Sequence, residues 1–424
     1  MVSKINRIIF YKLLILLLIM YNHQLYSESV DSLRIDNLTV KVAIERAKTN
    51  NPYLNKLQNE IKSLESYKTS IYSPDKINFS YLNEGIGNDN VAESRVTLSQ
   101  DFNFPLKTYY QVASINSKIE YLKFKYEEEV LKVRESIKIV YTNLSYTQEV
   151  LKIKKQQNLI ADSLQFAVSM RLDAGFATEL DRLKAKIYFD NSNNEIREAE
   201  VNLHTARYAL FNLIGLDPDL QSYSIKFPDS ISYFETKINQ KEVLSKMKNY
   251  PGYLADEELI KSSNHEYNAV VADYLPDLSL SIYNQSFKVG DPAYGYEIGL
   301  KLPIWFFLDQ SSKAESKNYE IEMAKNNIYE RYLNLKKEVE YAWHSYDISR
   351  SKIMNFTASI SQDSKQLLDL TFEAYRAGTV DLINLLDAQR IYLDNQIKYF
   401  TELKEYYINI ITLEKFTNEE IIFN

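Results

Sequence analysis

The side chains that usually carry catalysis are few and scattered in this sequence. His204, His265 and His344 each stand alone on helical patterns, without the paired spacing that zinc requires. The chain has no cysteine, which excludes thiol nucleophiles, thiolate metal sites and a disulfide framework. It also has no glycine-rich phosphate loop and no nucleophile elbow. We therefore predict a protein that is not an enzyme and that has no catalytic residue, metal site or cofactor.

The first 27 residues have the pattern of a secretory signal peptide. A basic start with Lys4, Arg7 and Lys12 precedes an apolar run over residues 13–20, and small Ser27 offers a cleavage point. The alternative, a membrane anchor, requires about 20 apolar residues, and the run here is much shorter. Removing this segment would change the formal net charge from -7 to about -10. An exported chain with this charge has no global basic surface, so we expect no nucleic-acid partner.

The chain contains one pattern twice, over residues 173–186 and 376–389. Each copy places a glycine, Gly175 or Gly378, after an alanine at the end of a long helical run. A glycine there can adopt the left-handed conformation that ends a helix, and Thr178 and Asp381 can cap the next helix. The chain has only nine glycines, which makes a coincidence less plausible. Both copies predict tight helix-turn-helix tips, although each alone also fits an ordinary helical hairpin.

The elements around these tips recur in the same order in both halves. A short helix ends before Pro52 or Pro251, a longer helix follows, and then apolar residues alternate with polar ones as in strands. Heptad-like helical patterns run over residues 106–173 and 310–376, and they return over 178–214 and 381–416. We predict a mainly helical fold with a small β part, made of two repeats at residues 28–225 and 226–424. Between them, residues 217–232 are expected to form a surface linker packed against the helices.

Each repeat is expected to contain one β-hairpin, at about residues 76–104 and 278–304. The loops lie around residues 85–90 and 290–292, and aromatic residues gather at the strand ends. A half-buried sheet in a soluble domain would fit one such pair. A membrane barrel also has strands with one apolar and one polar face and has aromatic side chains at its interfaces. Four strands cannot close a barrel around a pore, so this interpretation requires several chains to share one. The aromatic residues are Phe102, Phe104, Trp305, Phe306 and Phe307.

This order of features resembles the TolC family of outer-membrane efflux and secretion channels over essentially the whole mature chain. The features that carry the resemblance are the start at residues 38–52, the two hairpins, the Leu302-Pro303-Ile304 strand exit and the second tip, which leads into Asp387-Ala388-Gln389. The resemblance implies a homotrimer in the outer membrane of a Gram-negative-type cell. Three chains would share a 12-stranded barrel, and their coiled-coil hairpins would extend into the periplasm.

The resemblance also implies roles for residues at the tips. Asp181 and Tyr375 match a contact between helices that closes the pore, and Asp387 matches an acidic ring in the constriction. Two positions depart from the family pattern, because Val380 replaces an arginine and Asn384 replaces a second acidic residue. We therefore expect a gate that is held differently. The residues expected to meet a periplasmic adaptor are Ala174, Gly175, Ala377, Gly378 and Thr379.

The implied function is a passive conduit of a tripartite efflux or secretion system. Its expected partners are two further copies of the chain, a periplasmic adaptor (membrane fusion) protein, an inner-membrane pump of RND or ABC type and outer-membrane lipid. The cargo could be drugs, metals or proteins. The main alternative is an exported coiled-coil scaffold or adhesin without a pore, for which strands with a lipid-compatible face would have no use. An inner-membrane adaptor protein is a third candidate. Such a protein should contain a lipoyl-like β domain flanked by glycine-rich turns, and the sequence has no such pattern.

Overall fold

The computed structural model describes residues 37–85, 93–216, 225–287, 290–417 and 419–423, and the chain divides into two compact units. The small unit contains residues 222–228 and the chain up to Leu38. In it, Asn37 forms a parallel bridge with Lys226, and the Leu38 amide donates to the Lys226 carbonyl at 2.9 Å. All helices and strands below belong to the larger unit. The expected signal peptide at residues 1–27 and most of the first hairpin loop lie outside the described residues.

The first half begins with two helices that meet at a proline, as the sequence predicts. Helix α2 (Val40–Asn50) is capped by the Thr39 hydroxyl, which accepts a hydrogen bond from the Val42 amide. Helix α3 (Pro52–Ile71) begins at its proline, and the Asn51 side chain caps it. After the first hairpin, α4 (Pro105–Asp173) runs for 69 residues without a break, and α5 (Glu179–Leu213) returns beside it. At about 1.5 Å per residue, α4 is about 100 Å long.

The second half repeats this order with one interruption. It contains α6 (Gln240–Lys246), a short 3₁₀ turn (Met247–Asn249), α7 (Pro251–Ala272), α8 (Gln310–Asn355), α9 (Ser361–Arg376) and α10 (Leu382–Thr417). The sequence predicts one continuous helix over residues 310–376, but a π turn (Phe356–Ile360) separates α8 from α9. The Thr357 hydroxyl donates to the carbonyls of Ile353 and Met354, both at 3.1 Å, at the start of this turn. A side chain that competes for helical carbonyls favours such a local departure.

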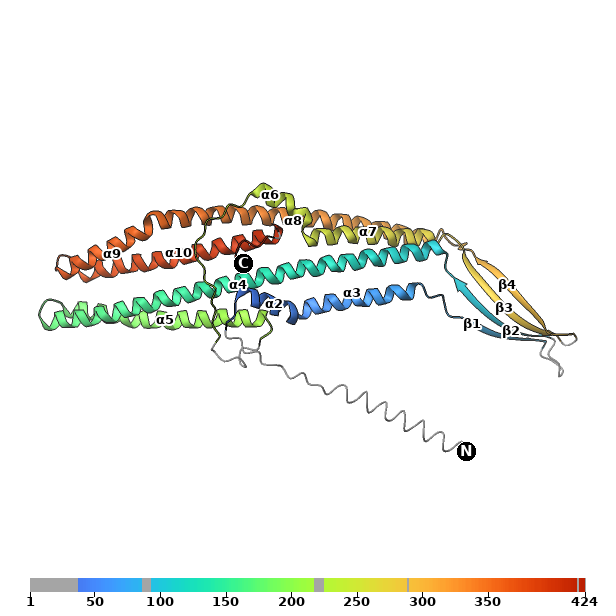
Figure 1. Cartoon of the computed structure of the whole chain (residues 1–424), viewed down its shortest axis with the longest axis horizontal. Coiled ribbons are helices and arrows are strands. Elements are labelled where there is room, and N and C mark those ends of the chain that lie inside the picture. The colour runs from blue at the N-terminus through green and yellow to red at the C-terminus, as the bar shows by residue number, and fades with distance from the viewer. Residues whose placement is uncertain (1–36, 86–92, 217–224, 288–289, 418, 424) are drawn as a thin grey trace, which may run out of the picture. The chain divides into compact units, whose positions relative to one another are not determined.

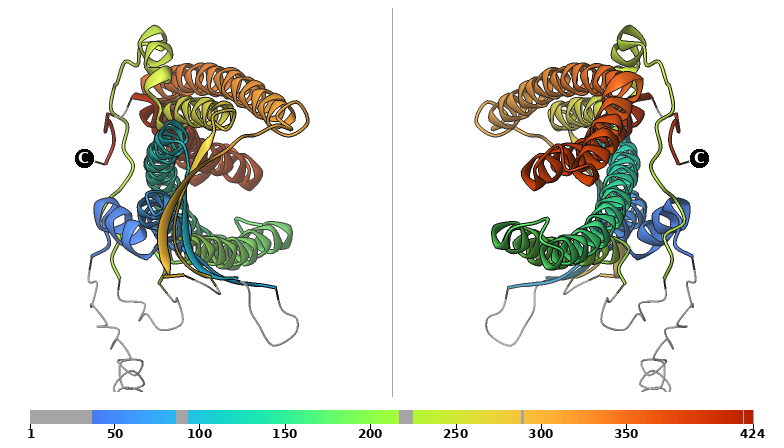
Figure 2. Two further views of the ribbon diagram at one scale, coloured as in Figure 1. Left: turned by 90° about the vertical axis from the view of Figure 1, so that its right-hand side faces the viewer. Right: turned by 90° about the vertical axis from the view of Figure 1, so that its left-hand side faces the viewer.

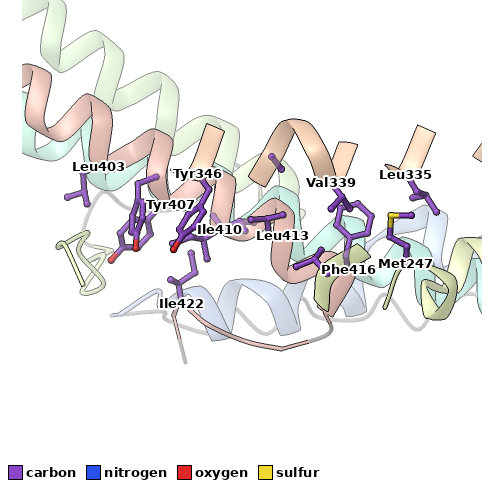
Figure 3. Packing of buried hydrophobic residues seen from close by; sticks show 14 of the residues in the cluster. Met247, Leu335, Val339, Tyr346, Leu403, Tyr407, Ile410, Leu413, Phe416 and Ile422 are labelled. Carbon is purple, nitrogen blue, oxygen red and sulfur yellow. The ribbon is translucent and has the colours of Figure 1, made fainter. Parts of the chain in front are cut away.

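Helix α4 is the centre of the larger unit, because it packs against α2, α3, α5, α7 and α10. Figure 2, which views the chain along its helices, shows α4 between α5 and the pair α7 and α8. The main core lies where α8, α10 and the turn before α7 meet (Figure 3). Its buried residues include Met247, Leu335, Val339, Tyr346, Leu403, Tyr407, Ile410, Leu413 and Phe416.

The segment that joins the two halves is held by tyrosine hydroxyls from α4, α8 and α10, and the α8 contact is from Tyr346 to the Thr236 carbonyl. Tyr407 and Tyr406 of α10 donate to the carbonyls of Ser232 and Phe234 at 2.9 and 3.0 Å. The Asp229 amide donates to the Tyr141 hydroxyl on α4 at 3.3 Å. Residues 229–232, the end of the predicted linker, therefore pack against the helices together with residues 233–236, whereas residues 217–224 lie outside the described part.

The strands form one antiparallel sheet with the order β1-β2-β3-β4. Strands β1 (Asn78–Glu84) and β2 (Glu93–Phe102) make the first hairpin, and β3 (Asp277–Phe287) and β4 (Ala293–Lys301) make the second. Both predicted hairpins are confirmed. The sequence does not indicate that β2 pairs with β3, which joins the two halves and leaves β1 and β4 as edge strands. In the larger unit, the sheet and the two helical tips lie at opposite ends of the long helices (Figure 1).

Candidate functional site

The two helical tips have the same backbone geometry. Gly175 and Gly378 have φ angles of +79° and +75°, in the left-handed region that favours glycine. The amide after each glycine donates back to a carbonyl of the last helical turn, from Phe176 to Arg171 at 2.8 Å and from Thr379 to Ala374 at 3.0 Å. This pattern closes a helix end in a Schellman-type turn. The predicted tips are therefore confirmed as turns, while their contact with an adaptor remains a prediction.

The residues that follow the two glycines differ in chemistry. Phe176 is 76% exposed and presents an aromatic ring to solvent. Thr379, at the equivalent place, uses its hydroxyl to donate to the Ala374 carbonyl at 3.0 Å. The first tip is therefore apolar at this position and the second is polar.

Thr178 caps the helix that leaves the first tip, as the sequence predicts, and Asp181 completes the cap. Its carboxylate accepts from the Thr178 amide at 3.1 Å and from the Thr178 hydroxyl at 2.7 Å, and the Thr178 hydroxyl accepts from the Asp181 amide. This reciprocal capping box fixes the first turn of α5. The hydrogen bonds from Thr178 hold the pKa of Asp181 below its ordinary value, with smaller contributions from Lys184 and Arg171.

Arg171 connects the two tips. Its guanidinium lies 4.8 Å from the centre of the Tyr375 ring and donates to the Tyr375 carbonyl at 3.0 Å. Tyr375 is 9% exposed. Burial raises the pKa of Tyr375, the charge of Arg171 opposes this rise, and the charge of Asp181 adds to it. Asp181, Arg171 and Tyr375 thus form one electrostatic group that joins the two hairpins, which we call the tip cluster.

Apolar packing beneath the tip cluster holds the two hairpins against each other. The first hairpin contributes buried residues of α4 and α5, and the second contributes residues of α9 and α10. Val380, where the sequence resemblance implies an arginine, packs against this group. Arg171 reaches Tyr375 from the other hairpin. The buried residues are Leu164, Val168, Ala185, Tyr375, Leu382 and Leu385.

Asn384 and Asp387 lie on the exposed side of α10, three residues apart. Both point away from the apolar face that carries Leu385, which is fully buried. Asp387 forms an ion pair with Arg390, and both side chains are more than half exposed. The structure does not bring this pair into the tip cluster. Arg390 was missed by the sequence reasoning, although its spacing of three residues from Asp387 is a recognisable signal.

The sheet has one strongly apolar face. The register places large apolar side chains of all four strands on the same side, and most of them are exposed. An exposed apolar surface of this extent marks a site of contact with lipid or protein. Its members are Phe79, Tyr81, Val96, Leu98, Phe102, Leu278, Leu280, Ile282, Tyr294, Tyr296, Ile298 and Leu300.

The opposite face is polar and carries charges in pairs. Lys301 of β4 forms an ion pair with Asp101 of β2 near the helices. Farther along the strands, Arg95 lies 3.6 Å from Glu93. A sheet with one apolar and one polar face fits the boundary between lipid and water.

Aromatic side chains follow the sheet where β4 leads into α8. Trp305, Phe306 and Phe307 are 63%, 48% and 54% exposed, and the Phe306 ring lies 5.9 Å from that of Tyr274. Amphipathic rings are typical of the level at which a membrane meets water. The predicted clustering of aromatic residues at this strand end is thus present in the structure.

The described residues contain no helix that is both long and apolar enough to cross a bilayer. Nor do they contain a group of three or more histidine, cysteine, aspartate or glutamate side chains arranged to hold a metal ion.

Sequence comparisons with known proteins give a partial match. No family model matches the sequence. The cobalt-zinc-cadmium resistance protein CzcC of Cupriavidus metallidurans is 22% identical over 250 residues, which is 59% of this chain and 59% of that protein. The match thus covers less than two thirds of this curated relative.

Solved structures match over most of the chain. A structure of CusC, described in terms of folding and transmembrane channel formation, has a TM-score of 0.74 at 16% identity. The match covers 92% of this chain and 95% of that chain. The Campylobacter jejuni CmeC outer membrane channel has a TM-score of 0.76 at 18% identity, with coverage of 89% and 85%. At this level of identity the likeness establishes the fold.

Proposed function

We propose that this chain, which has the fold of the TolC-like outer-membrane channels, is the outer-membrane conduit of a tripartite efflux system. The proposal is supported by the resemblance of the sequence to that family and by the match of the fold over nearly the whole chain. The chain supplies no chemistry of its own in this role. It provides a path from the periplasm through the outer membrane, and a pump supplies the energy.

The single observation that carries the proposal is the two-faced sheet. Ile298 and Tyr294 are 65% and 84% exposed on one face, while Arg95 and Lys301 lie on the other. In water the apolar face would be unfavourable, whereas against lipid it is stabilising. Because β1 and β4 are edge strands, their unpaired backbone groups require partners inside a membrane. Three copies that pair β1 of one chain with β4 of the next would meet that need in a closed 12-stranded barrel.

The tips are the proposed docking site for a periplasmic adaptor, which would link the conduit to an inner-membrane pump. Gly175 and Gly378 leave open space around their Cα atoms, since a Cβ atom there would meet nothing within 4 Å. A partner's backbone or side chain can therefore approach each turn closely. The residues beside them, Ala174, Ala377 and Thr379, complete the proposed docking surface.

The tip cluster is the proposed gate. Arg171 holds Tyr375 of the other hairpin, so the two tips of one chain move together while this contact persists. Opening would require a displacement of the hairpins that breaks it. Asn384 and Asp387 are proposed to face the path nearby, where Arg390 reduces the effective charge of Asp387.

For the cargo we propose divalent metal cations, because the curated relative over more than half of the chain is a cobalt-zinc-cadmium resistance protein. The conduit does not need to bind the cargo, since a passive path requires only favourable entry and exit. Selection of the cargo is assigned to the pump.

Cell fractionation followed by native mass measurement tests the proposal. We expect the protein in the outer-membrane fraction, and its detergent extract should contain a species of three chain masses that heating converts to monomer. A soluble monomer or dimer would instead support a periplasmic coiled-coil scaffold or adhesin without a pore. Replacing Ala377 by Trp should then abolish metal efflux in cells and leave the trimer intact, because Ala377 is exposed, has an ordinary φ of -73° and leaves Gly378 to form the turn.

A further inference from the structure

The outer end of the polar sheet face holds a stack built from one residue of each of three strands. Tyr283 of β3 lies opposite Gly295 of β4 in the antiparallel register. A Cβ atom on Gly295 would collide with the Tyr283 ring. The ring can therefore lie down against β4 only because this position is a glycine, an arrangement in which an aromatic side chain covers a strand glycine.

Arg95 of β2 forms the upper layer of the stack. Its guanidinium carbon lies 4.8 Å from the centre of the Tyr283 ring. The same group donates to the Gln285 side chain at 3.0 Å and lies 3.6 Å from the Glu93 carboxylate, while Gln285 also donates to Glu93. Arg95 is thus fixed in one orientation by a ring beneath it and by polar partners at its side. The order from the backbone outward is Gly295, Tyr283 and Arg95.

The position of Arg95 makes its charge important for this face. Lys301, near the helices, forms its own ion pair with Asp101. Within the described parts of the four strands, Arg95 is the cation of the outer half of the polar face, where Glu93 and Glu84 lie opposite each other in the register. Without Arg95 these two carboxylates would remain, and this level of the face would become strongly acidic.

We propose that Arg95, seated on Tyr283 and Gly295, determines the charge selectivity of the conduit at the outer end of its barrel. This inference rests on the proposed function, in which three chains turn their polar faces toward one water-filled lumen. Three guanidinium groups then lie at one level and offset the carboxylates around them. A ring of fixed charges at a pore controls the local concentration of ions of either sign. The stack serves to hold each guanidinium at a defined height above the sheet.

Reversal potentials in a planar bilayer under a KCl gradient test the charge assignment. Arg95→Gln should raise the ratio of potassium to chloride permeability by about twofold or more, because one unit charge per chain is lost beside a water-filled path. Glu93→Gln should lower the ratio. The double variant E93Q/R95Q should restore the wild-type value, since the two changes cancel. Unchanged reversal potentials in both single variants would overturn the inference.

Two further variants test the role of the stack. Gly295→Ala displaces the Tyr283 ring but keeps every charge, so its reversal potential should shift in the same direction as that of Arg95→Gln. Tyr283→Phe keeps the ring and should behave as wild type. If Gly295→Ala also behaves as wild type while the trimer and its conductance persist, the packing of Tyr283 on Gly295 does not position Arg95. A wild-type protein that forms no channels would contradict the proposed function, whereas wild-type channels with insensitive variants would contradict only this inference.

Discussion

The guanidinium of Arg171 lies over the ring of Tyr375, 4.8 Å from its centre, although the two residues are 204 positions apart in the chain. Arg171 also donates to the Tyr375 carbonyl at 3.0 Å, so one side chain binds both the ring and the backbone of the opposite tip. A cation–π contact combined with a charged hydrogen bond in a partly buried site is worth more than either contact in water. This contact connects the two helical hairpins at their tips, where we place the gate.

Replacing Arg171 by Gln should therefore loosen the tips. We expect the single-channel conductance of purified trimers in a planar bilayer to rise, because the two hairpins of each chain can separate more easily. Arg376→Gln is the matched control, since Arg376 also lies at a tip but pairs with Glu373 of its own helix in an exposed contact at 3.4 Å. Equal conductance in wild type and R171Q would show that this contact does not hold the gate.

The capping box at Asp181 predicts a pH dependence of the first tip. The folded state lowers the pKa of Asp181 below its ordinary value, mainly through the Thr178 hydroxyl and amide. A lowered folded pKa stabilises the helix end above the unfolded value, and this stabilisation is lost as the pH falls through the folded value. Hydrogen exchange of residues 176–186, corrected for intrinsic rates, should show protection that decreases as the pH falls through the ordinary pKa of aspartate, about 3.9, and below it. In Asp181→Asn this decrease should be smaller, since only the lowered pKa of Glu179, which Arg182 causes, then contributes in this segment.

A buried ion pair holds the end of the chain. Lys138, 1% exposed, lies 2.8 Å from Glu414, and Glu414 also accepts from the Ile422 amide at 2.7 Å. Glu414→Ala leaves a buried lysine without its carboxylate and should lower stability by about 3–5 kcal/mol. It should also expose residues 419–423 to limited proteolysis.

The exposed pair of Glu373 and Arg376 provides the control for that variant. Glu373→Ala should change stability by less than about 1 kcal/mol, because exposed ion pairs contribute little. Thermal unfolding of the detergent-solubilised protein compares the two variants. Similar losses in both would contradict a structural role for the buried pair.

Gly252, at the start of α7, leaves room for the Glu128 carboxylate and the Arg331 guanidinium to lie close to the helix backbone. A Cβ atom there would lie 2.7 Å from the Glu128 carboxylate and 2.8 Å from Nη1 of Arg331. Burial alone would raise the pKa of Glu128, but Lys125, Lys132 and Arg331 outweigh it and hold the pKa below its usual range. Gly252→Ala forces this network apart and should destabilise the protein by about 1–3 kcal/mol. Gly299→Ala, with its nearest neighbour at 3.6 Å, should have little effect in the same thermal measurement.

Local signals in the sequence predict much of this fold. Pro52, Pro251, Gly175 and Gly378 each fix a helix boundary through their own backbone preferences, so their effects need no knowledge of distant residues. Alternation of polar and apolar residues likewise identifies the strands. Long-range pairings are different. The joining of β2 to β3 and the contact of Arg171 with Tyr375 depend on how the two halves meet, which no local pattern encodes.

The candidate site shows the same division. The sequence identifies Thr178 as a helix cap, and the family resemblance points to Asp181 and Asp387, but the partners of these two carboxylates are only partly local. Arg390 lies within one helical turn of Asp387 and could have been found from its spacing. Arg171 could not, because a basic residue in the last turn of a helix is common and usually interacts with the helix end. The π turn at Phe356–Ile360 has no reliable sequence signal either.

Disulfide cross-linking between the edge strands tests the shared barrel most directly. Within one chain β1 and β4 are three interstrand spacings apart, about 14 Å, which is too far for a disulfide. Variants pairing Ser80→Cys on β1 with Glu297→Cys or Gly299→Cys on β4 have no competing thiol, because the natural sequence has no cysteine. After oxidation in outer membranes, at least one pair should give a covalent ladder on a denaturing gel that ends at three chains. Only monomers in every pair, or a ladder that continues beyond three chains, would contradict the trimeric channel.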